Sequence, residues 1–163
     1  MEYKYSWEGF KEACLTIKSN NFFETEKEPN IITESWKRIF VSRIYYACFH
    51  RAIEVAEEIT TYKKIPAYLE FYYNRNKVHG DILMFYANLA KDYPMPQILK
   101  QASYIVSKNI KKLHDMRKDC DYTKELSEGY INSCCEQSRI ISNSIESELI
   151  SILKHFKSKT KQK

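Results

Sequence analysis

Glycine is scarce in this chain: Gly9, Gly80 and Gly129 are the only three among 163 residues. All-β folds and doubly wound α/β sheets both depend on many tight turns, where glycine is the usual residue. Three scattered glycines also exclude the phosphate-binding loops G-x-G-x-x-G and G-x-x-x-x-G-K-[ST]. The scarcity therefore predicts an all-α fold built from long helices with few connections.

Apolar residues that recur every three or four positions indicate where the helices lie. The expected helices cover about residues 5–19, 31–60, 67–76, 79–90, 96–117 and 131–156. The last pattern is the clearest, because it holds for about seven turns and must pack on the rest of the fold or on a partner chain. A length of 163 residues suits one core, so we expect a single domain over 1–153 and a basic tail over 154–163.

The positive charge is concentrated at the end of the sequence. The chain has 26 Lys+Arg against 21 Asp+Glu, a net charge of +5, and the segment 154–163 contributes five lysines and no acid. Residues 1–153 are therefore neutral, so the net charge says little about what the fold binds. We expect the tail to be frayed and solvated, with a weak nucleic-acid contact as the alternative.

Several absences point to a reduced, metal-free protein of the cytoplasm. No segment has the roughly 18 apolar residues that a membrane-spanning helix needs, and the polar N-terminal residues do not resemble a signal peptide. The five cysteines are odd in number and show no C-x-x-C spacing, so we interpret them as small packing residues. We expect no cofactor, no metal site and no membrane contact.

One basic stretch stands out inside the body of the chain, between residues 97 and 118. Its six basic residues, against a single acid at Asp115, are Lys100, Lys108, Lys111, Lys112, Arg117 and Lys118. Cations near the end of a helix complement its macrodipole, which is one explanation of the pattern. The alternative is a phosphate-binding face, for which the RNA-binding candidates are Lys108, Lys111, Lys112 and Lys118.

Three short motifs carry a resemblance to a known family. They are SRIYYACFH at Ser42–His50, VHG at Val78–Gly80 and RKDCDY at Arg117–Tyr122. In this order and spacing they resemble the HEPN superfamily of small prokaryotic helical proteins, in the branch with S-R-x-Y-Y-A-x-F-H and R-x-x-x-D-Y. The resemblance covers about residues 36–151.

The resemblance implies a four- or five-helix up-and-down bundle that forms a homodimer. Many HEPN proteins are metal-independent endoribonucleases of toxin–antitoxin or antiviral defence systems, and the toxins are often paired with a small nucleotidyltransferase antitoxin. Their motif is an Arg followed, after four to six residues, by a His. The resemblance gives Arg117 the role of stabilising charge on the phosphate while the ribose 2′-hydroxyl attacks it.

The chain departs from that motif because Tyr122 stands where the His is expected. A phenol with an ordinary pKa of about 10 is a poor general base near neutral pH, although it can orient a hydroxyl or donate a hydrogen bond to phosphate. His114 lies three positions before Arg117 and would share its face of a helix, so it is the first candidate to replace the missing His. The candidate catalytic residues are therefore Arg117, Asp121, Tyr122 and His114.

A structural interpretation of the same region is equally open. Arg43 lies in an apolar helix, where an unpaired guanidinium would be costly, so we expect Asp119 or Asp121 as its partner. Ser42, Arg43 and Tyr46 would then belong to a buried polar network that holds the helices together. The many tyrosines are, in the same way, more typical of a core or a dimer interface than of a platform for bases.

Two main classes of function follow from these residues. The first is a HEPN-type RNA-associated protein, in its most demanding form a metal-independent endoribonuclease, that acts as a homodimer. The second is a non-catalytic HEPN interaction module that binds a nucleotidyltransferase or a defence-system protein, and Tyr122 favours it. A nucleotide-binding subunit is a third hypothesis.

Overall fold

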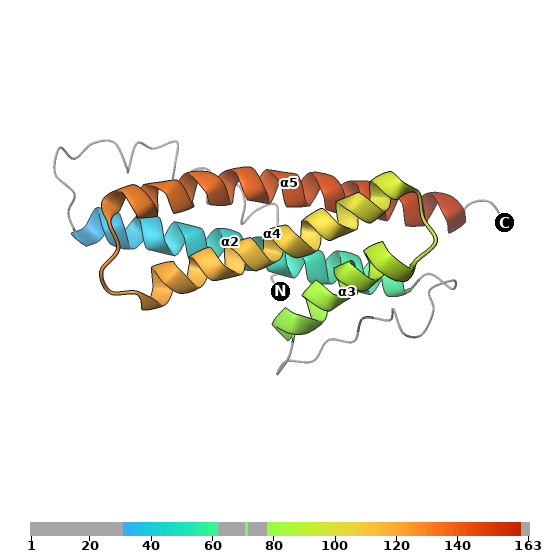
Figure 1. The fold of residues 1–163 in the computed structure, drawn as a ribbon, viewed down its shortest axis with the longest axis horizontal. Helices are drawn as coiled ribbons and strands as arrows, with labels where there is room; N and C mark the ends of the chain where they lie inside the picture. The colour runs from blue at the N-terminus through green and yellow to red at the C-terminus, as the bar shows by residue number, and fades with distance from the viewer. Residues whose placement is uncertain (1–30, 62–70, 72–77, 161–163) are drawn as a thin grey trace, which may run out of the picture. The chain divides into compact units, whose positions relative to one another are not determined.

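The computed structural model of the chain describes residues 31–61, 71 and 78–160, and the side chains of 34–61, 71 and 78–158. The helices in these ranges are α2 (Ile31–Thr60), α3 (Val78–Asp92), α4 (Gln97–Tyr122) and α5 (Glu128–Thr160) (Figure 1). All regular secondary structure in the described part is helical, so the predicted all-α fold is confirmed there. The helices expected over 5–19 and 67–76 lie outside the described residues, apart from Phe71.

The helix boundaries agree with the sequence pattern at some ends and differ at others. α2 has the expected bounds, and α3 ends shortly before Pro94 as expected. α4 continues beyond Arg117 to Tyr122, so the RKDCDY motif is helical. α5 is longer than its apolar pattern at both ends, and most of the expected tail is therefore part of a helix.

The described tail residues are held by contacts. The Phe156 side chain is buried, and Lys157 Nζ lies 2.9 Å from Glu58 Oε1. A half-exposed ion pair of this kind contributes less than about 1 kcal/mol, whereas burial of a phenyl ring contributes about 2 to 3 kcal/mol. The ring is thus the main restraint, and the expectation of a frayed tail is wrong as far as Thr160.

The described helices form two compact units. Unit 1 contains residues 31–47 and 113–142, and unit 2 contains 48–61, 71, 78–112 and 143–160. The chain passes from one unit to the other inside α2, α4 and α5, so each of these helices contributes a part to both units. Each unit has its own buried apolar residues.

Unit 1 packs the first half of α2 against the end of α4 and the start of α5. Its buried apolar side chains come from all three helices: Phe40, Val41, Ile44, Tyr45, Ala47, Leu113, Met116, Cys120, Ile131, Cys134 and Ile141. The α2 and α4 segments run antiparallel, because Arg38 contacts Thr123 whereas Tyr46 contacts Arg117. Polar residues of α2 therefore lie against the last turns of α4.

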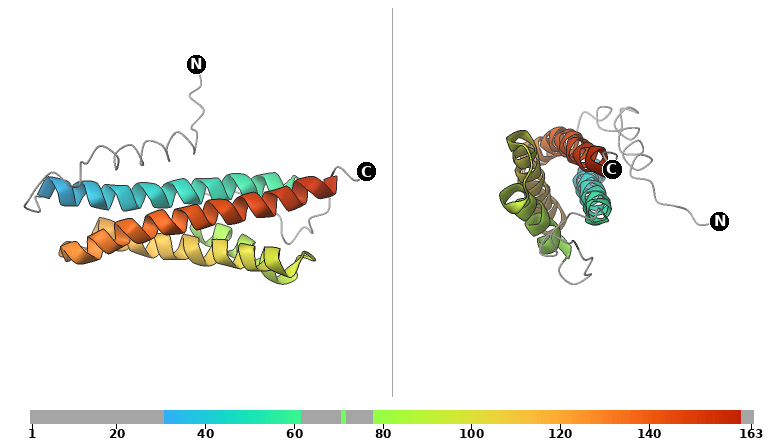
Figure 2. Two further views of the ribbon diagram at one scale, coloured as in Figure 1. Left: turned by 90° about the horizontal axis from the view of Figure 1, so that it is seen from above. Right: turned by 90° about the vertical axis from the view of Figure 1, so that its right-hand side faces the viewer.

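Unit 2 combines the second half of α2 with α3, the first part of α4 and the rest of α5. Its largest fully buried side chains are Ile59, Ile82, Tyr86, Leu89, Ile110, Ile145, Leu149 and Ile152. The Tyr86 hydroxyl donates to the Ala52 carbonyl oxygen at 2.9 Å, which satisfies the polar atom of a buried ring. In this unit α5 lies alongside α2 (Figure 2), with Arg51 Nε 3.7 Å from Glu146 Oε1.

Candidate functional site

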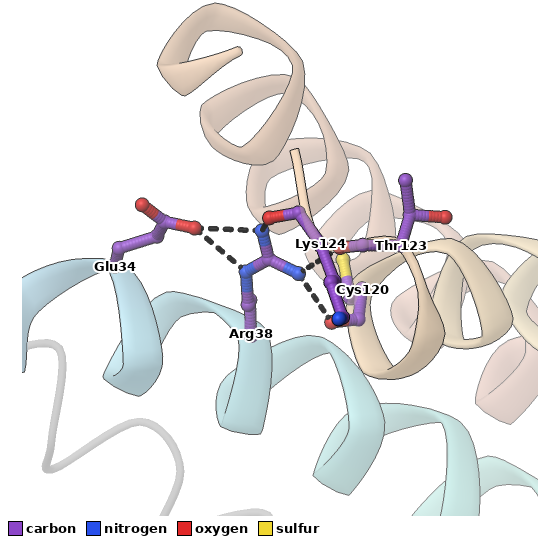
Figure 3. Close-up of polar contacts among 5 residues, drawn as sticks. All are labelled: Glu34, Arg38, Cys120, Thr123 and Lys124. Atoms are coloured by element: carbon purple, nitrogen blue, oxygen red, sulfur yellow. Dashed lines mark hydrogen bonds and ion pairs between the residues drawn. The ribbon is translucent and has the colours of Figure 1, made fainter. Parts of the chain in front are cut away.

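Arg38 of α2 closes the C-terminal end of α4 (Figure 3). Its Nη1 donates to the carbonyl oxygens of Cys120 at 2.9 Å and Thr123 at 2.6 Å, and its Nη2 donates to that of Lys124 at 3.3 Å. Glu34, one turn earlier in α2, accepts from Arg38 Nε at 2.8 Å and orients the guanidinium. The last carbonyls of a helix have no partner within it, so this cation satisfies them and complements the helix dipole.

This capping restrains the last turn of α4, which extends further than expected. The expected end is near Arg117, but the buried Cys120 continues the apolar spacing of Leu113 and Met116, and the helix reaches Tyr122. Arg117 and Asp121 are therefore neighbours on one helical face, and Arg117 Nε lies 2.6 Å from Asp121 Oδ2. Sequence reasoning missed Arg38, because nothing in the pattern of α2 shows which helix end that residue meets.

Arg117 lies between two tyrosine rings. Its Cζ is 5.2 Å from the ring centroid of Tyr46 in α2 and 5.2 Å from that of Tyr122, distances typical of cation–π contacts. The Arg117 side chain is 16% exposed, whereas Tyr122 is 68% exposed. A solvent-exposed aromatic ring thus lies over a largely buried guanidinium.

Asp121 links the two helices. Its carboxylate accepts a hydrogen bond from the Ser42 hydroxyl of α2, in addition to its contact with Arg117. Ser42 and Tyr46 are one turn apart in α2, so both face the last turns of α4. We refer to Ser42, Tyr46, Arg117, Asp121 and Tyr122 as the Arg117 cluster. All five residues lie in the motif segments Ser42–His50 and Arg117–Tyr122, and the structure brings them together.

Arg117 remains a cation in this cluster. Burial acts to lower the pKa of Arg117, but the Asp121 carboxylate and the two tyrosines act in the opposite direction, so its pKa is raised above the ordinary value. The Nε–H is close to Asp121 but is not aligned for a hydrogen bond with any described residue. The contact is therefore an ion pair that leaves one buried donor unused, and unused buried donors are uncommon in folded proteins.

Arg43 is not part of the cluster, contrary to expectation. Its side chain is exposed, because it points away from the face of α2 that carries its buried neighbours. Both expected partners are engaged elsewhere: Asp121 contacts Arg117, and Asp119 Oδ2 accepts from the Tyr130 hydroxyl at 2.5 Å. The prediction of a buried, paired Arg43 is wrong. Arg43 is adjacent in sequence to buried residues, but adjacent residues of a helix point to different sides of it.

His114 lies beside the cluster. Its half-buried ring is 5.4 Å from the ring of Tyr45, and its Nδ1 is 3.7 Å from Asp115 Oδ1. Tyr45 in turn lies 5.1 Å from Tyr46, so one aromatic ring separates His114 from the Arg117 cluster along this path. Burial raises the pKa of Tyr45 above its ordinary value.

The candidate RNA-binding lysines divide between the two units. Lys118 belongs to unit 1 and directly follows Arg117, whereas Lys108, Lys111 and Lys112 belong to unit 2. All four side chains are exposed, as contact with a phosphate backbone requires. Of the four, only Lys118 is in the unit that holds the Arg117 cluster.

The cysteines in the described ranges are free thiols. Cys48, Cys120 and Cys134 are buried, and Cys135 is half-buried. Burial, together with the neighbouring thiols of α5, raises the pKa of Cys120 to about 12, so this residue is a packing group and a weak nucleophile. Within the same ranges, no group of three or more His, Cys, Asp or Glu side chains is arranged to hold a metal ion. None of the described helices is long and apolar enough to cross a membrane.

Comparisons of the chain with protein-family models, with curated proteins and with solved structures find no match. The resemblance to HEPN proteins therefore stays a prediction that rests on the three sequence motifs. What the structure adds is the spatial relation between two of them, because residues from SRIYYACFH and from RKDCDY meet in the Arg117 cluster.

Proposed function

We propose that this chain is a HEPN-type RNA-associated protein in which Arg117 contacts an RNA phosphate. The observation that carries the proposal is the convergence of two motif segments on one guanidinium, with Tyr46 from the first and Tyr122 from the second on its faces. A guanidinium oriented by a carboxylate suits recognition of phosphate oxygens. The exposed Tyr122 ring beside it suits stacking of the adjoining base.

Metal-independent RNA cleavage in a cytoplasmic homodimer is the most demanding form of this proposal. The 2′-hydroxyl would attack the adjacent phosphorus, and the 5′-oxygen of the next nucleotide would leave with a proton taken from water, which gives a 2′,3′-cyclic phosphate and a free 5′-hydroxyl. Arg117 would stabilise the negative charge that develops on the phosphate, and Tyr122 would donate a hydrogen bond to the phosphate or the leaving group. His114, an imidazole next to the cluster, is the candidate to accept the proton of the 2′-hydroxyl.

A non-catalytic interaction module is the second candidate, because Arg117 already has a counter-ion. Asp121 lies 2.6 Å from its Nε, and the Ser42 hydroxyl holds that carboxylate in place. A phosphate would have to share the guanidinium with Asp121, and this competition weakens phosphate binding. In addition, the phenol of Tyr122 is a poor general base. In this candidate the cluster fastens α4 to α2, and the chain binds a nucleotidyltransferase or a defence-system protein.

Cleavage of a labelled, structured RNA by the full chain in EDTA separates the two candidates. The variants to compare with the wild type are Arg117→Ala and Tyr122→Phe, with Arg139→Ala as the matched control. Arg139 belongs to the same unit, pairs with Glu136 one turn away on its own helix, and lies outside the cluster. Circular dichroism of each variant establishes that the helices are intact.

For the nuclease, Arg117→Ala is expected to abolish cleavage and Tyr122→Phe to slow it about 100-fold, whereas Arg139→Ala cleaves like the wild type. Cleavage that survives in folded Arg117→Ala would contradict the assigned role of Arg117. If no protein cleaves, anisotropy of labelled RNA decides between the candidates: binding that depends on Arg117 supports an RNA-associated protein without nuclease activity. Absence of both cleavage and binding favours the interaction module.

A further inference from the structure

A hollow of about 370 Å³ opens in unit 2, between the end of α3 and the beginning of α4. A tight connection joins these two helices (Figure 1, green to yellow). The lining combines small, amide, basic and aromatic side chains and includes Ala87, Ala90, Lys91, Gln97, Lys100 and Tyr104. The hollow is shallow and largely open to solvent, so a ligand would lie against its lining and keep part of its own surface exposed.

Two lysines bring positive charge to this hollow. Lys91 lies in the last turn of α3, and Lys100 lies in the first turn of α4, which contains no acid. Among the residues that the structure describes, no acid lines the hollow, and neither lysine forms an ion pair with any of them. The positive end of the α4 dipole adds to this charge. The hollow therefore favours an anionic ligand.

Tyr104 brings an aromatic surface to the same place. Its side chain is 60% exposed, whereas the core tyrosines Tyr45 and Tyr86 are 1% and 0% exposed. Tyr104 follows Lys100 by one helical turn, so the ring and the ammonium group lie on the same face of α4. Ala87 and Ala90 line the hollow from α3 and have no bulky side chain to fill it. An open aromatic face next to cations is typical of sites that stack a nucleobase.

We propose that the hollow binds a nucleotide, with the base on Tyr104 and the phosphate between Lys91 and Lys100. The Gln97 amide offers a donor and an acceptor for polar atoms on the edge of the base. The nucleotide is either free or part of a single-stranded RNA, because both present an aromatic base joined to a phosphate. The exposed Lys108, one turn beyond Tyr104, would meet the next phosphate of a strand. This site is separate from the Arg117 cluster and does not depend on the function proposed there.

Two titrations of the full chain in EDTA test the proposal and distinguish the two sources of the nucleotide. Calorimetry measures the binding of adenosine monophosphate, and fluorescence anisotropy measures the binding of a labelled oligoadenylate of about twelve nucleotides. Affinity for the monophosphate that depends on Tyr104 supports a free nucleotide as the ligand. Affinity for the oligoadenylate that depends on Tyr104, with no affinity for the monophosphate, supports single-stranded RNA as the ligand.

Three variants of the hollow set the expected results. Tyr104→Ala removes an exposed ring and is expected to lower affinity about tenfold or more, whereas Tyr104→Phe keeps the stacking surface and retains most of the affinity. Lys100→Gln is expected to weaken binding and to flatten the dependence of log Kd on log salt by about 0.7 for a strand. Arg139→Gln removes a basic residue of α5 that pairs with Glu136 on its own helix and lies outside both the hollow and the basic segment 154–163, so it is the control and is expected to bind like the wild type.

Several outcomes would overturn the proposal. They are unchanged affinity in Tyr104→Ala, equal losses in Lys100→Gln and Arg139→Gln, and no binding of either ligand at about 1 mM. Tighter binding of a polyglutamate peptide than of both nucleotide ligands would instead identify an acidic protein as the occupant. Tyr104→Ala is also measured in the Arg117→Ala background, in which any binding of the monophosphate by the Arg117 cluster is removed. A further loss of affinity there belongs to the hollow, so failure of the function proposed for the Arg117 cluster would not be mistaken for failure of this site. Thermal unfolding of each variant confirms that the fold is retained.

Discussion

The two units share three helices, yet different interactions join those helices in each. In unit 1, polar side chains connect α2 to α4: Arg38 binds the helix end, and Ser42 and Tyr46 belong to the Arg117 cluster. In unit 2 the buried contacts are largely apolar, with Leu149 fully buried and the Tyr86 hydroxyl satisfied by one carbonyl oxygen. Polar contacts are directional and costly to leave unmade, so they set where a helix ends and how a side chain points. Apolar contacts contribute stability with less geometric demand.

The largest loss of stability is expected in unit 2. Leu149→Ala removes most of a fully buried side chain and leaves a cavity, which should lower the free energy of unfolding by about 2 to 5 kcal/mol. The neighbouring residue Ile150 is 38% exposed, and Ile150→Ala should cost less than about 1 kcal/mol. Urea unfolding measures both variants. Equal losses would show that the apolar contacts of unit 2 are not its main source of stability.

In unit 1 the largest effect is expected at the cap of α4. Arg38→Ala leaves three backbone carbonyls without their donor, and we expect a loss of about 3 kcal/mol in the free energy of unfolding. Amide hydrogen exchange should accelerate over residues 119–122, because the last turn of the helix loses its restraint. Arg43→Ala, which removes an exposed arginine of the same helix, should change stability by less than about 0.5 kcal/mol. Unchanged exchange in Arg38→Ala would mean that the capping does not restrain the last turn of α4.

The contrast between Arg38 and Arg43 shows what could be predicted from the sequence. Periodicity predicted the bounds of α2 and the helical fold, because the apolar spacing depends on the local chain alone. The motif segments contain all members of the Arg117 cluster, but the sequence divided them between a candidate catalytic set and a structural network that also included His114 and Arg43. The partner of each arginine could not be predicted, since it depends on how one helix faces another. Arg38 meets the end of α4, while Arg43 points away from it.

The hollow of unit 2 was missed for a related reason. Tyr104 and Lys100 fit the helical pattern of α4, and their spacing alone does not reveal that α3 leaves a space beside them. The alanines that line this space, Ala87 and Ala90, look like ordinary core residues in the sequence. The small residues of α3 leave the Tyr104 ring of α4 accessible, and this becomes apparent only when the packing of the two helices is known.

Alkaline pH is expected to weaken unit 1 through Cys120. Burial raises the pKa of this thiol from its ordinary value of 9.0 to about 12, and no such burial acts on the unfolded chain. The folded state therefore holds the proton more tightly, so the contribution to stability is complete below about pH 9 and is lost as the pH rises towards about 12. The free energy of unfolding in urea should fall between about pH 8 and pH 10, and should fall less steeply in Cys120→Ala. Equal pH slopes for the two proteins would contradict the assignment.

The smallest effect is expected from the hydrogen bond that joins the helices inside the Arg117 cluster. Ser42→Ala removes the donor to Asp121 but keeps the ion pair with Arg117, so we expect a loss of about 1 kcal/mol in the free energy of unfolding. Ser133→Ala is the matched control, because Ser133 is exposed in the same unit and bonds only to Gln137 on its own helix among the described residues. If both variants lose the same small amount, the ion pair with Asp121 and the tyrosine rings hold Arg117 in place without help from the Ser42 hydroxyl. If Ser42→Ala loses more and also changes the affinity for RNA, the hydroxyl positions Asp121 for the guanidinium that the phosphate would meet.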